Sequence, residues 1–278
     1  MNVSERKIQM TMTSLSEKVS ISLVGTGTAT INWGDGTESL ICENIEDIDD
    51  YKHTYLDVFA HTITITGEKI TGLKTYKNQL TELDVSGNAT LTELECWFNQ
   101  LTTLDVSKNT ALTWLDCSFN QLTALNVRKN TALEWLFCDN NQITELDVSK
   151  NTMLENLDCR DNQLTALDVS NNTALTGMAG SDFEALNVSK NQFTAAALNA
   201  LFMTMPVLSS EIAIFENPGT DDCDESIAEA KGWNVRGSNK KMTMTTLAGE
   251  VSISCRNRSG NPRVGRRLQK RKVQRYLV

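Results

Sequence analysis

The sequence predicts a mainly β protein with short helices, in which a repeat solenoid follows an N-terminal β-sandwich and ends in a βα cap. Three observations predict this fold: a near-literal repeat of 21 residues, alternating strand patterns before it, and helix–strand patterns after it. The expected parts are a β-sandwich (1–67), the solenoid (68–192), the cap (193–237), the start of a second sandwich copy (238–254) and an aberrant, disordered basic tail (255–278).

The N-terminal segment has the pattern of short strands joined by tight turns. Polar and apolar residues alternate through residues 18–32 and again in HTITITG at 61–67. In WGDGT, Asp35 is expected to accept a backbone N–H while the flanking glycines tolerate positive φ. WGDGT, the following HTY at 53–55 and HTITITG together resemble a short PKD-type β-sandwich. Modules of that type usually act as spacers or adhesive units outside the cell.

The repeat is the clearest feature of the chain. Asn99 opens NQLTTLDVSKNTALTWLDCSF, and Asn120 and Asn141 open close copies of it. Each copy has two halves, LxxLxCxxN and LxxLDVxxN, whose apolar residues point inward and are buried only when coils stack. The asparagines fall at the turns, where their amides can bond neighbouring coils. They form two expected ladders: Asn78, Asn99, Asn120, Asn141 and Asn162, and Asn88, Asn109, Asn130, Asn151 and Asn172.

Over residues 70–191 this pattern resembles the bacterial leucine-rich-repeat class with 21-residue repeats, as found in gut-type bacterial surface proteins. The resemblance implies a non-enzymatic binding or adhesion role at the cell surface or outside the cell. The last copy, Leu175 to Asn191, is degenerate, with Ser181 where an asparagine is expected. The segment after it predicts a helix ending before Pro206, a strand, a helix ending at Gly232 and a strand. Its NPG…C…SIA…KGW run resembles the C-terminal cap of the same proteins.

Charge and composition narrow the partners. Net charge is −9, but residues 255–278 carry nine basic and no acidic residues, so the other 254 residues have a net charge of −18. An acidic body argues against nucleic acid as the partner. The sequence has no run of 18 apolar residues, so no membrane span is expected. The N-terminus lacks the apolar core of a signal peptide. No cofactor is expected.

The basic tail follows an interrupted copy of the N-terminus. KMTMTTLAGEVSIS at 241–254 repeats IQMTMTSLSEKVSIS at 8–22. We interpret the tail as the product of a frameshift, because Val264 to Arg267 can be encoded by codons that give Trp-Gly-Asp-Gly when read one base later; since codon choice is free, this shows compatibility with a frameshift. The chain would then be a truncated piece of a longer protein. Binding of an anionic partner by the tail is the alternative.

Two ladders of potential ligand atoms have simpler interpretations than metal binding. Cys96, Cys117, Cys138 and Cys159 recur every 21 residues, but a row along stacked coils is not a tetrahedral zinc site, and buried thiols are common in cores. Asp84, Asp105, Asp147 and Asp168 offer oxygen atoms for calcium, yet no loop gathers several at one point, which favours a solvated face. His53 and His61 have no matched nucleophile, so catalysis is not expected.

The positions that vary between coils predict the binding surface. Three rows result: Glu93, Trp114, Trp135 and Asn156; Glu95, Asp116, Phe137 and Asp158; and Trp97, Ser118, Asp139 and Arg160. Aromatic rings beside carboxylates suit a protein or glycan ligand, although the rings can instead pack against the solenoid's flank. The alternative functions are a structural spacer in a longer surface protein and an accessory part of a hydrolase. The candidate ligand-binding residues are Glu95, Trp97, Trp114, Asp116, Trp135, Phe137, Asp158 and Arg160.

Overall fold

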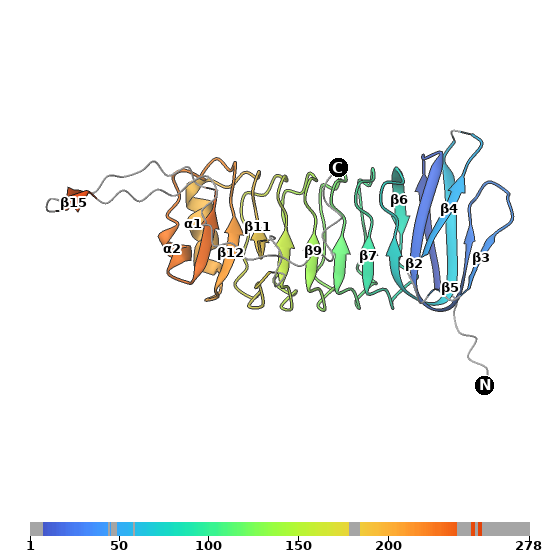
Figure 1. The fold of residues 1–278 in the computed structure, drawn as a ribbon, viewed down its shortest axis with the longest axis horizontal. Helices are drawn as coiled ribbons and strands as arrows, with labels where there is room; N and C mark the ends of the chain where they lie inside the picture. The colour runs from blue at the N-terminus through green and yellow to red at the C-terminus, as the bar shows by residue number, and fades with distance from the viewer. Residues whose placement is uncertain are drawn as a thin grey trace. The chain divides into compact units, whose positions relative to one another are not determined.

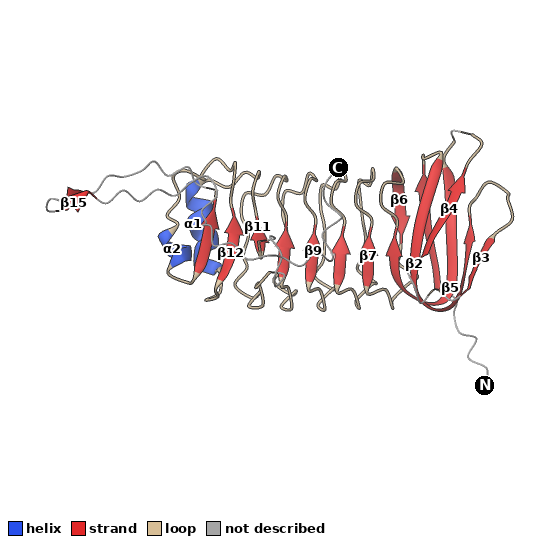
Figure 2. Cartoon of the chain, viewed as in Figure 1, coloured by secondary structure: helices blue, strands red, loops and turns tan. Residues whose placement is uncertain are grey.

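The computed structural model describes residues 8–43, 45, 49–57, 59–177, 184–237, 246–247 and 250–251. The chain divides into two compact units, Met1–Ser238 and Asn239–Val278. Within its described residues, the first unit contains a 13-stranded sheet and two short helices, so this part of the protein is mainly β, as predicted (Figures 1 and 2). Of the second unit, the structure describes the antiparallel pair β14 (Thr246–Leu247) and β15 (Glu250–Val251). The basic tail and most of the expected second sandwich copy lie outside the described residues.

The N-terminal part is an antiparallel sheet built on two long strands. The register of β2 and β5 is interrupted near Gly25, where a side chain would collide with the backbone oxygen of Lys69. Strand β1 pairs with β5, β3 and β4 pair with β2, and β6 pairs with β1, while apolar residues of β1, β2 and β5 fill a shared core. The strands are β1 (Ile8–Ser14), β2 (Lys18–Asn32), β3 (Leu40–Glu43), β4 (Asp49–Thr54), β5 (His61–Lys74) and β6 (Leu80–Asp84).

Strand β5 joins this sheet to the solenoid. Its first half pairs antiparallel with β1, and its last residues, 72–74, pair parallel with β7. The expected domain boundary after residue 67 therefore falls within one strand. The hydrogen-bonded sheet is continuous from the N-terminal strands into the coils.

The coils stack as a parallel ladder, which makes this part of the chain a β-solenoid. Leu94 pairs with Leu115, Leu115 with Leu136 and Leu136 with Leu157, so each strand pairs with its equivalent in the next repeat. These leucines are fully buried, as are the four ladder cysteines, which are free thiols. The predicted inward direction of both positions is confirmed. The ladder strands are β7 (Glu93–Glu95), β8 (Trp114–Asp116), β9 (Trp135–Phe137), β10 (Asn156–Asp158) and β11 (Leu186–Asn187).

The last coil differs from the sequence prediction. Leu157 pairs with Leu186, which lies further along the chain than one repeat, so this coil is longer than the others. Asn191 takes the turn position, because its amide donates to the carbonyl of Cys159. Ser181, where the sequence alignment placed this turn, lies outside the described residues. The sequence alignment of residues 185–191 was wrong because the two half-repeats have similar patterns: ALNVSKN resembles the LDVSKN half but lies in the strand half.

The chain continues the ladder after this coil. Helix α1 (Ala195–Thr204) begins at Thr194, whose hydroxyl accepts the N–H of Ala197, and it ends before Pro206, as predicted. Strand β12 (Ser210–Ala213) pairs parallel with β11, and β13 (Trp233–Arg236) pairs parallel with β12. Helix α2 (Ser226–Glu229) is shorter than the sequence suggests.

The two asparagine ladders bond adjacent coils, as predicted, but not equally. The Asn120 amide donates to the carbonyls of Cys96 and Cys117 at 3.0 and 3.1 Å, and its Oδ1 accepts the N–H of Leu101 at 3.0 Å. In the second ladder, the Asn130 amide donates to two carbonyls at 2.9 and 2.8 Å. Its Oδ1 is buried with no partner, and the same holds for Asn109, Asn151 and Asn172.

Candidate functional site on the outward face of the strand ladder

The outward face of strands β7 to β10 carries the candidate site. Because side chains alternate along a strand, the inward direction of Leu115 places Trp114 and Asp116 on the opposite face. The parallel register then aligns the rows that the sequence predicts: Trp114 pairs with Trp135, and Asp116 lies between Glu95 and Phe137. Backbone bonds between coils continue past the strands, from the Phe98 N–H to the Ser118 carbonyl.

The aromatic residues at the centre of this face contact one another. The rings of Trp114 and Trp135 stack with centroids 5.6 Å apart, and the Phe137 ring lies 5.2 Å from Trp114. Both tryptophans are half-buried, and Phe137 is only 9% exposed. The predicted aromatic strip therefore exists, but its open part is the two tryptophan rings.

Ion pairs between coils hold most of the acidic side chains. The Lys74 ammonium lies 2.5 Å from Glu93 and 2.8 Å from Glu95. Burial lowers the pKa of Lys74, but the bonds and charges of these two carboxylates together outweigh burial and raise the pKa above its ordinary value. Arg160 lies 3.6 Å from both Asp158 and Asp139. Sequence reasoning missed Lys74, although it stands one repeat before Glu95 and so extends the same row.

Burial perturbs the carboxylates in this face. Burial raises the pKa of Asp116 to about 7, against opposing bonds from Ser118, and nearby Asp139 and Glu95 raise it further. Burial also raises the pKa of Asp158, with repulsion from Asp139 added and attraction from Arg160 opposing. Glu95, Asp116 and Asp158 are each less than a tenth exposed, so this row is less open than the sequence suggests.

A second aromatic group lies at one end of the same face. Trp97 stacks on Tyr76 with ring centroids 4.7 Å apart, and the Lys77 ammonium lies 5.1 Å from the Trp97 ring. Phe98 and Phe119 follow the third row and are exposed, with centroids 5.7 Å apart. The candidate site did not include these two phenylalanines, although their recurrence at the period of the repeat is visible in the sequence.

The aspartate ladder has a local role in the turns. The carboxylates of Asp84, Asp105, Asp147 and Asp168 are exposed, and each accepts the N–H of the serine two residues further on, at 2.8–2.9 Å. Asn126 makes the equivalent bond to the Arg128 N–H, so the turn does not require a charge. Within the described residues, no group of three His, Cys, Asp or Glu side chains is arranged to hold a metal ion.

The histidines of the N-terminal sheet form aspartate pairs that the sequence did not reveal. His53 lies 2.7 Å from Asp35, whose carboxylate also accepts the predicted backbone N–H, that of Thr37. Burial opposes charge on Asp35, but the bonds from Thr37 and then His53 hold its pKa below the ordinary range. His61 pairs with Asp57 at 2.7 Å and stacks on Tyr55. These contacts order the WGDG and HTY segments.

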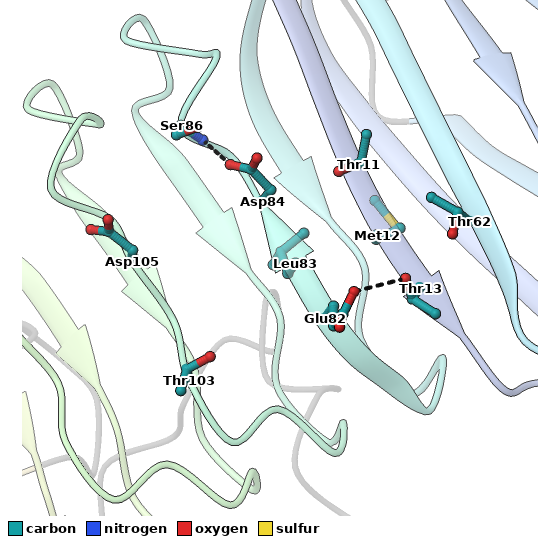
Figure 3. A pocket seen from close by; sticks show the side chains of 10 residues that line it. All are labelled: Thr11, Met12, Thr13, Thr62, Glu82, Leu83, Asp84, Ser86, Thr103 and Asp105. Carbon is teal, nitrogen blue, oxygen red and sulfur yellow. Dashed lines mark hydrogen bonds between the residues drawn. The ribbon is translucent and has the colours of Figure 1, made fainter.

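A hollow of about 540 Å³ lies where β1 and β6 meet the next coil (Figure 3). Its lining is rich in threonine hydroxyls and includes the carboxylates of Glu82, Asp84 and Asp105. Glu82 accepts the Thr13 hydroxyl at 3.3 Å, and Asp84 and Asp105 serve their own turns. The carboxylates of the hollow therefore already have hydrogen-bond partners, which makes the hollow a weaker candidate for ligand binding than the strand face. In the described part of the chain, no helix has the length and apolar character to cross a membrane.

Comparison with known proteins finds solved structures that are similar to part of the chain. No protein-family model and no curated protein matches the sequence. The chain is similar to the functional domain of InlJ from Listeria monocytogenes, which includes a cysteine ladder, at 27% identity and a TM-score of 0.36, covering 63% of this chain and 50% of that one. It is also similar to the internalin InlF from L. monocytogenes str. 4b F2365, at 23% identity and a TM-score of 0.45, covering 56% and 45%. The chain thus spans about half the length of these structures.

Proposed function

We propose that the protein is a non-enzymatic binding module that presents the outward face of its strand ladder to a protein ligand. The observation that carries this proposal is the pair of stacked tryptophans, Trp114 and Trp135, on a face whose reverse side is committed to the leucine core. Tryptophan is enriched in interfaces because it supplies large contact area with few rotatable bonds. The contact residues are Glu95, Trp97, Trp114, Asp116, Trp135, Phe137, Asp158 and Arg160.

We further propose that the chain acts at the bacterial cell surface or outside the cell, as part of a 21-residue-repeat protein with a PKD-like module at its N-terminus. The resemblance of WGDG, HTY and the repeat to such proteins supports this. The repeat coils then act as the binding region. The βα elements from α1 to β13 act as the cap of the last coil, which would otherwise expose its apolar end.

An array screen tests the binding function. The intact chain is applied to arrays of extracellular proteins and glycans, followed by the double variant Trp114→Ala, Trp135→Ala. We expect the parent to bind a protein and the variant to bind it at least tenfold more weakly, as loss of central aromatic residues usually causes. Met203→Ala, at an exposed apolar residue of α1, is the control and should bind as the parent does.

The other outcomes reject the proposal in distinct ways. If the parent chain binds nothing on either array, the result favours the alternative function of a structural spacer in a longer surface protein. A double variant that binds as tightly as the parent moves the site away from the tryptophans. Selective binding of a neutral glycan replaces the protein ligand with a carbohydrate.

A further inference from the structure

The carboxylates on the strand face are each placed beside a cation, with one exception. Glu95 contacts Lys74 at 2.8 Å, and Arg160 serves both Asp139 and Asp158 at 3.6 Å. Asp116 stands between them and accepts the Ser118 N–H at 3.1 Å. Among the residues that the structure describes, no Lys, Arg or His side chain lies within ion-pair distance of Asp116.

The position of Asp116 makes this missing cation costly. Its side chain is on the outward face but only 5% exposed, so water screens it poorly. A buried carboxylate without a counter-ion favours its protonated form, in agreement with the upward shift of its pKa. A positive group brought by a ligand would restore the pairing that the rest of the face already has.

Aromatic rings lie on both sides of Asp116 along the same coil. Trp114 stands two residues before it and stacks on Trp135. Phe119 stands three residues after it, is 43% exposed and adopts a left-handed backbone with φ of 52°. That conformation is unfavourable for a bulky residue, and an exposed ring gains little from burial, so fold stability does not account for Phe119.

Two further polar groups on this face have no partner. The indole N–H of Trp114 and the Oδ1 of Asn156 are covered and unbonded. Asn156 pairs with Trp135 in the ladder, so both groups belong to the first row. A peptide backbone carries both the acceptor and the donor that they lack, but it reaches these covered atoms only if the two side chains turn outward, so Asp116 and the rings carry the argument.

We propose that Asp116 anchors an arginine or lysine side chain of a protein ligand, while apolar residues on either side of that basic residue contact Trp114 with Trp135 and Phe119 with Phe98. This inference rests on the proposed function and names the chemistry of its partner. Charge complementarity favours this partner over an acidic or uncharged one, because Asp116 is a carboxylate that has no Lys, Arg or His side chain of the chain's described residues beside it.

Two short peptides test the anchor. The intact chain is titrated with acetyl-Phe-Arg-Phe-amide and with acetyl-Phe-citrulline-Phe-amide, which keeps the shape of arginine without its charge. Binding is followed by the NMR signals of the tryptophan indole N–H groups. We expect the arginine peptide to bind about tenfold more tightly or better, since an unpaired buried charge is a large loss.

Matched variants locate the effect. Asp116→Asn should remove the preference for arginine, while Asp105→Asn, at an exposed carboxylate of the turn ladder, should keep it. Equal affinity for the two peptides, an undiminished preference in Asp116→Asn, or no saturable binding of the arginine peptide overturns the inference. An array ligand that depends on both tryptophans but not on Asp116 would overturn it while leaving the proposed function intact.

Discussion

At the scale of single residues, the carboxylate of Asp116 shows that stacking of the coils can bury a side chain on the outward face. Stacking places Asp116 directly between Glu95 and Phe137, so neighbouring coils remove water from a side chain that points outward. Sequence reasoning predicted that outward direction from the alternation around Leu115. It did not predict the burial, because burial depends on the size of side chains one coil away on each side.

The burial of Asp116 gives the protein a pH-dependent stability. Its pKa is about 7 in the folded chain and near the ordinary 3.8 in the unfolded chain. The folded state therefore binds more protons between pH 4 and 7, and the free energy of unfolding falls as pH rises through that window. At pH 8 we expect Asp116→Asn to raise the free energy of unfolding by about 1–4 kcal/mol, since one pKa unit corresponds to about 1.4 kcal/mol.

Urea denaturation at pH 4 and pH 8 measures this effect. The gain of Asp116→Asn should be nearly absent at pH 4, where the carboxyl group is protonated in the folded chain. Asp105→Asn is the control: bonds from Ser107 lower the pKa of Asp105, so its substitution should bring no gain at pH 8. A parent whose stability is the same at both pH values, with Asp116→Asn also unchanged, would show that Asp116 is solvated.

At the scale of the coil, the asparagine turns divide into two kinds. The first ladder uses both ends of the amide, because its Oδ1 accepts an N–H from the preceding coil, as Asn120 does from Leu101. In the second ladder, Asn109, Asn130, Asn151 and Asn172 use only the amide nitrogen. The sequence predicted both ladders from spacing alone, but their difference depends on the path of the backbone around each turn.

We therefore expect Asn120→Ala to destabilise the fold more than Asn130→Ala. The first substitution leaves the buried Leu101 N–H without its partner, whereas the carbonyls that either amide releases keep another donor, such as Asn99 at Cys96 or the Asn109 N–H at Val106. Each buried unsatisfied group costs about 1–3 kcal/mol, so the difference should be about 1 kcal/mol or more. Urea denaturation of both variants measures it, with Asn171→Ala at an exposed turn as the control. Equal losses from the two ladders would contradict the difference in bonding.

Contacts between segments mark the limit of sequence reasoning at this scale. The Thr37 N–H bond to Asp35 was predicted, because it is local to the GDG turn. The bond between Asp35 and His53 was missed, because it joins residues 18 positions apart in different segments of the chain. The step from Leu157 to Leu186 was likewise misaligned, since two similar half-repeats gave no signal to distinguish them.

At the scale of the whole molecule, the ladder and the N-terminal sheet are one hydrogen-bonded structure. The sequence predicted the solenoid because inward leucines recur at a fixed period. It did not predict that β5 belongs to both parts. The first half of β5 pairs with β1 and its last residues pair with β7, and the sequence of a strand does not show which strands it pairs with. Within the coils, however, each one contacts mainly its neighbours, and stability is then approximately a sum of local terms.

That locality leads to a test with the four ladder thiols. Leu115→Ala leaves a cavity in the core and should cost about 2–5 kcal/mol of unfolding free energy. Because coils couple to their neighbours, thiol labelling under native conditions should rise at Cys96, Cys117 and Cys138 before it rises at Cys42, which lies in the N-terminal sheet. Mass spectrometry after timed alkylation resolves the sites. Met153→Ala, at an exposed residue of the same solenoid, should change stability by less than about 0.5 kcal/mol and leave labelling unchanged. If all four thiols and Cys42 react together in Leu115→Ala, the chain unfolds as one cooperative unit, and the shared strand β5 couples the coils more strongly than a one-dimensional stack allows.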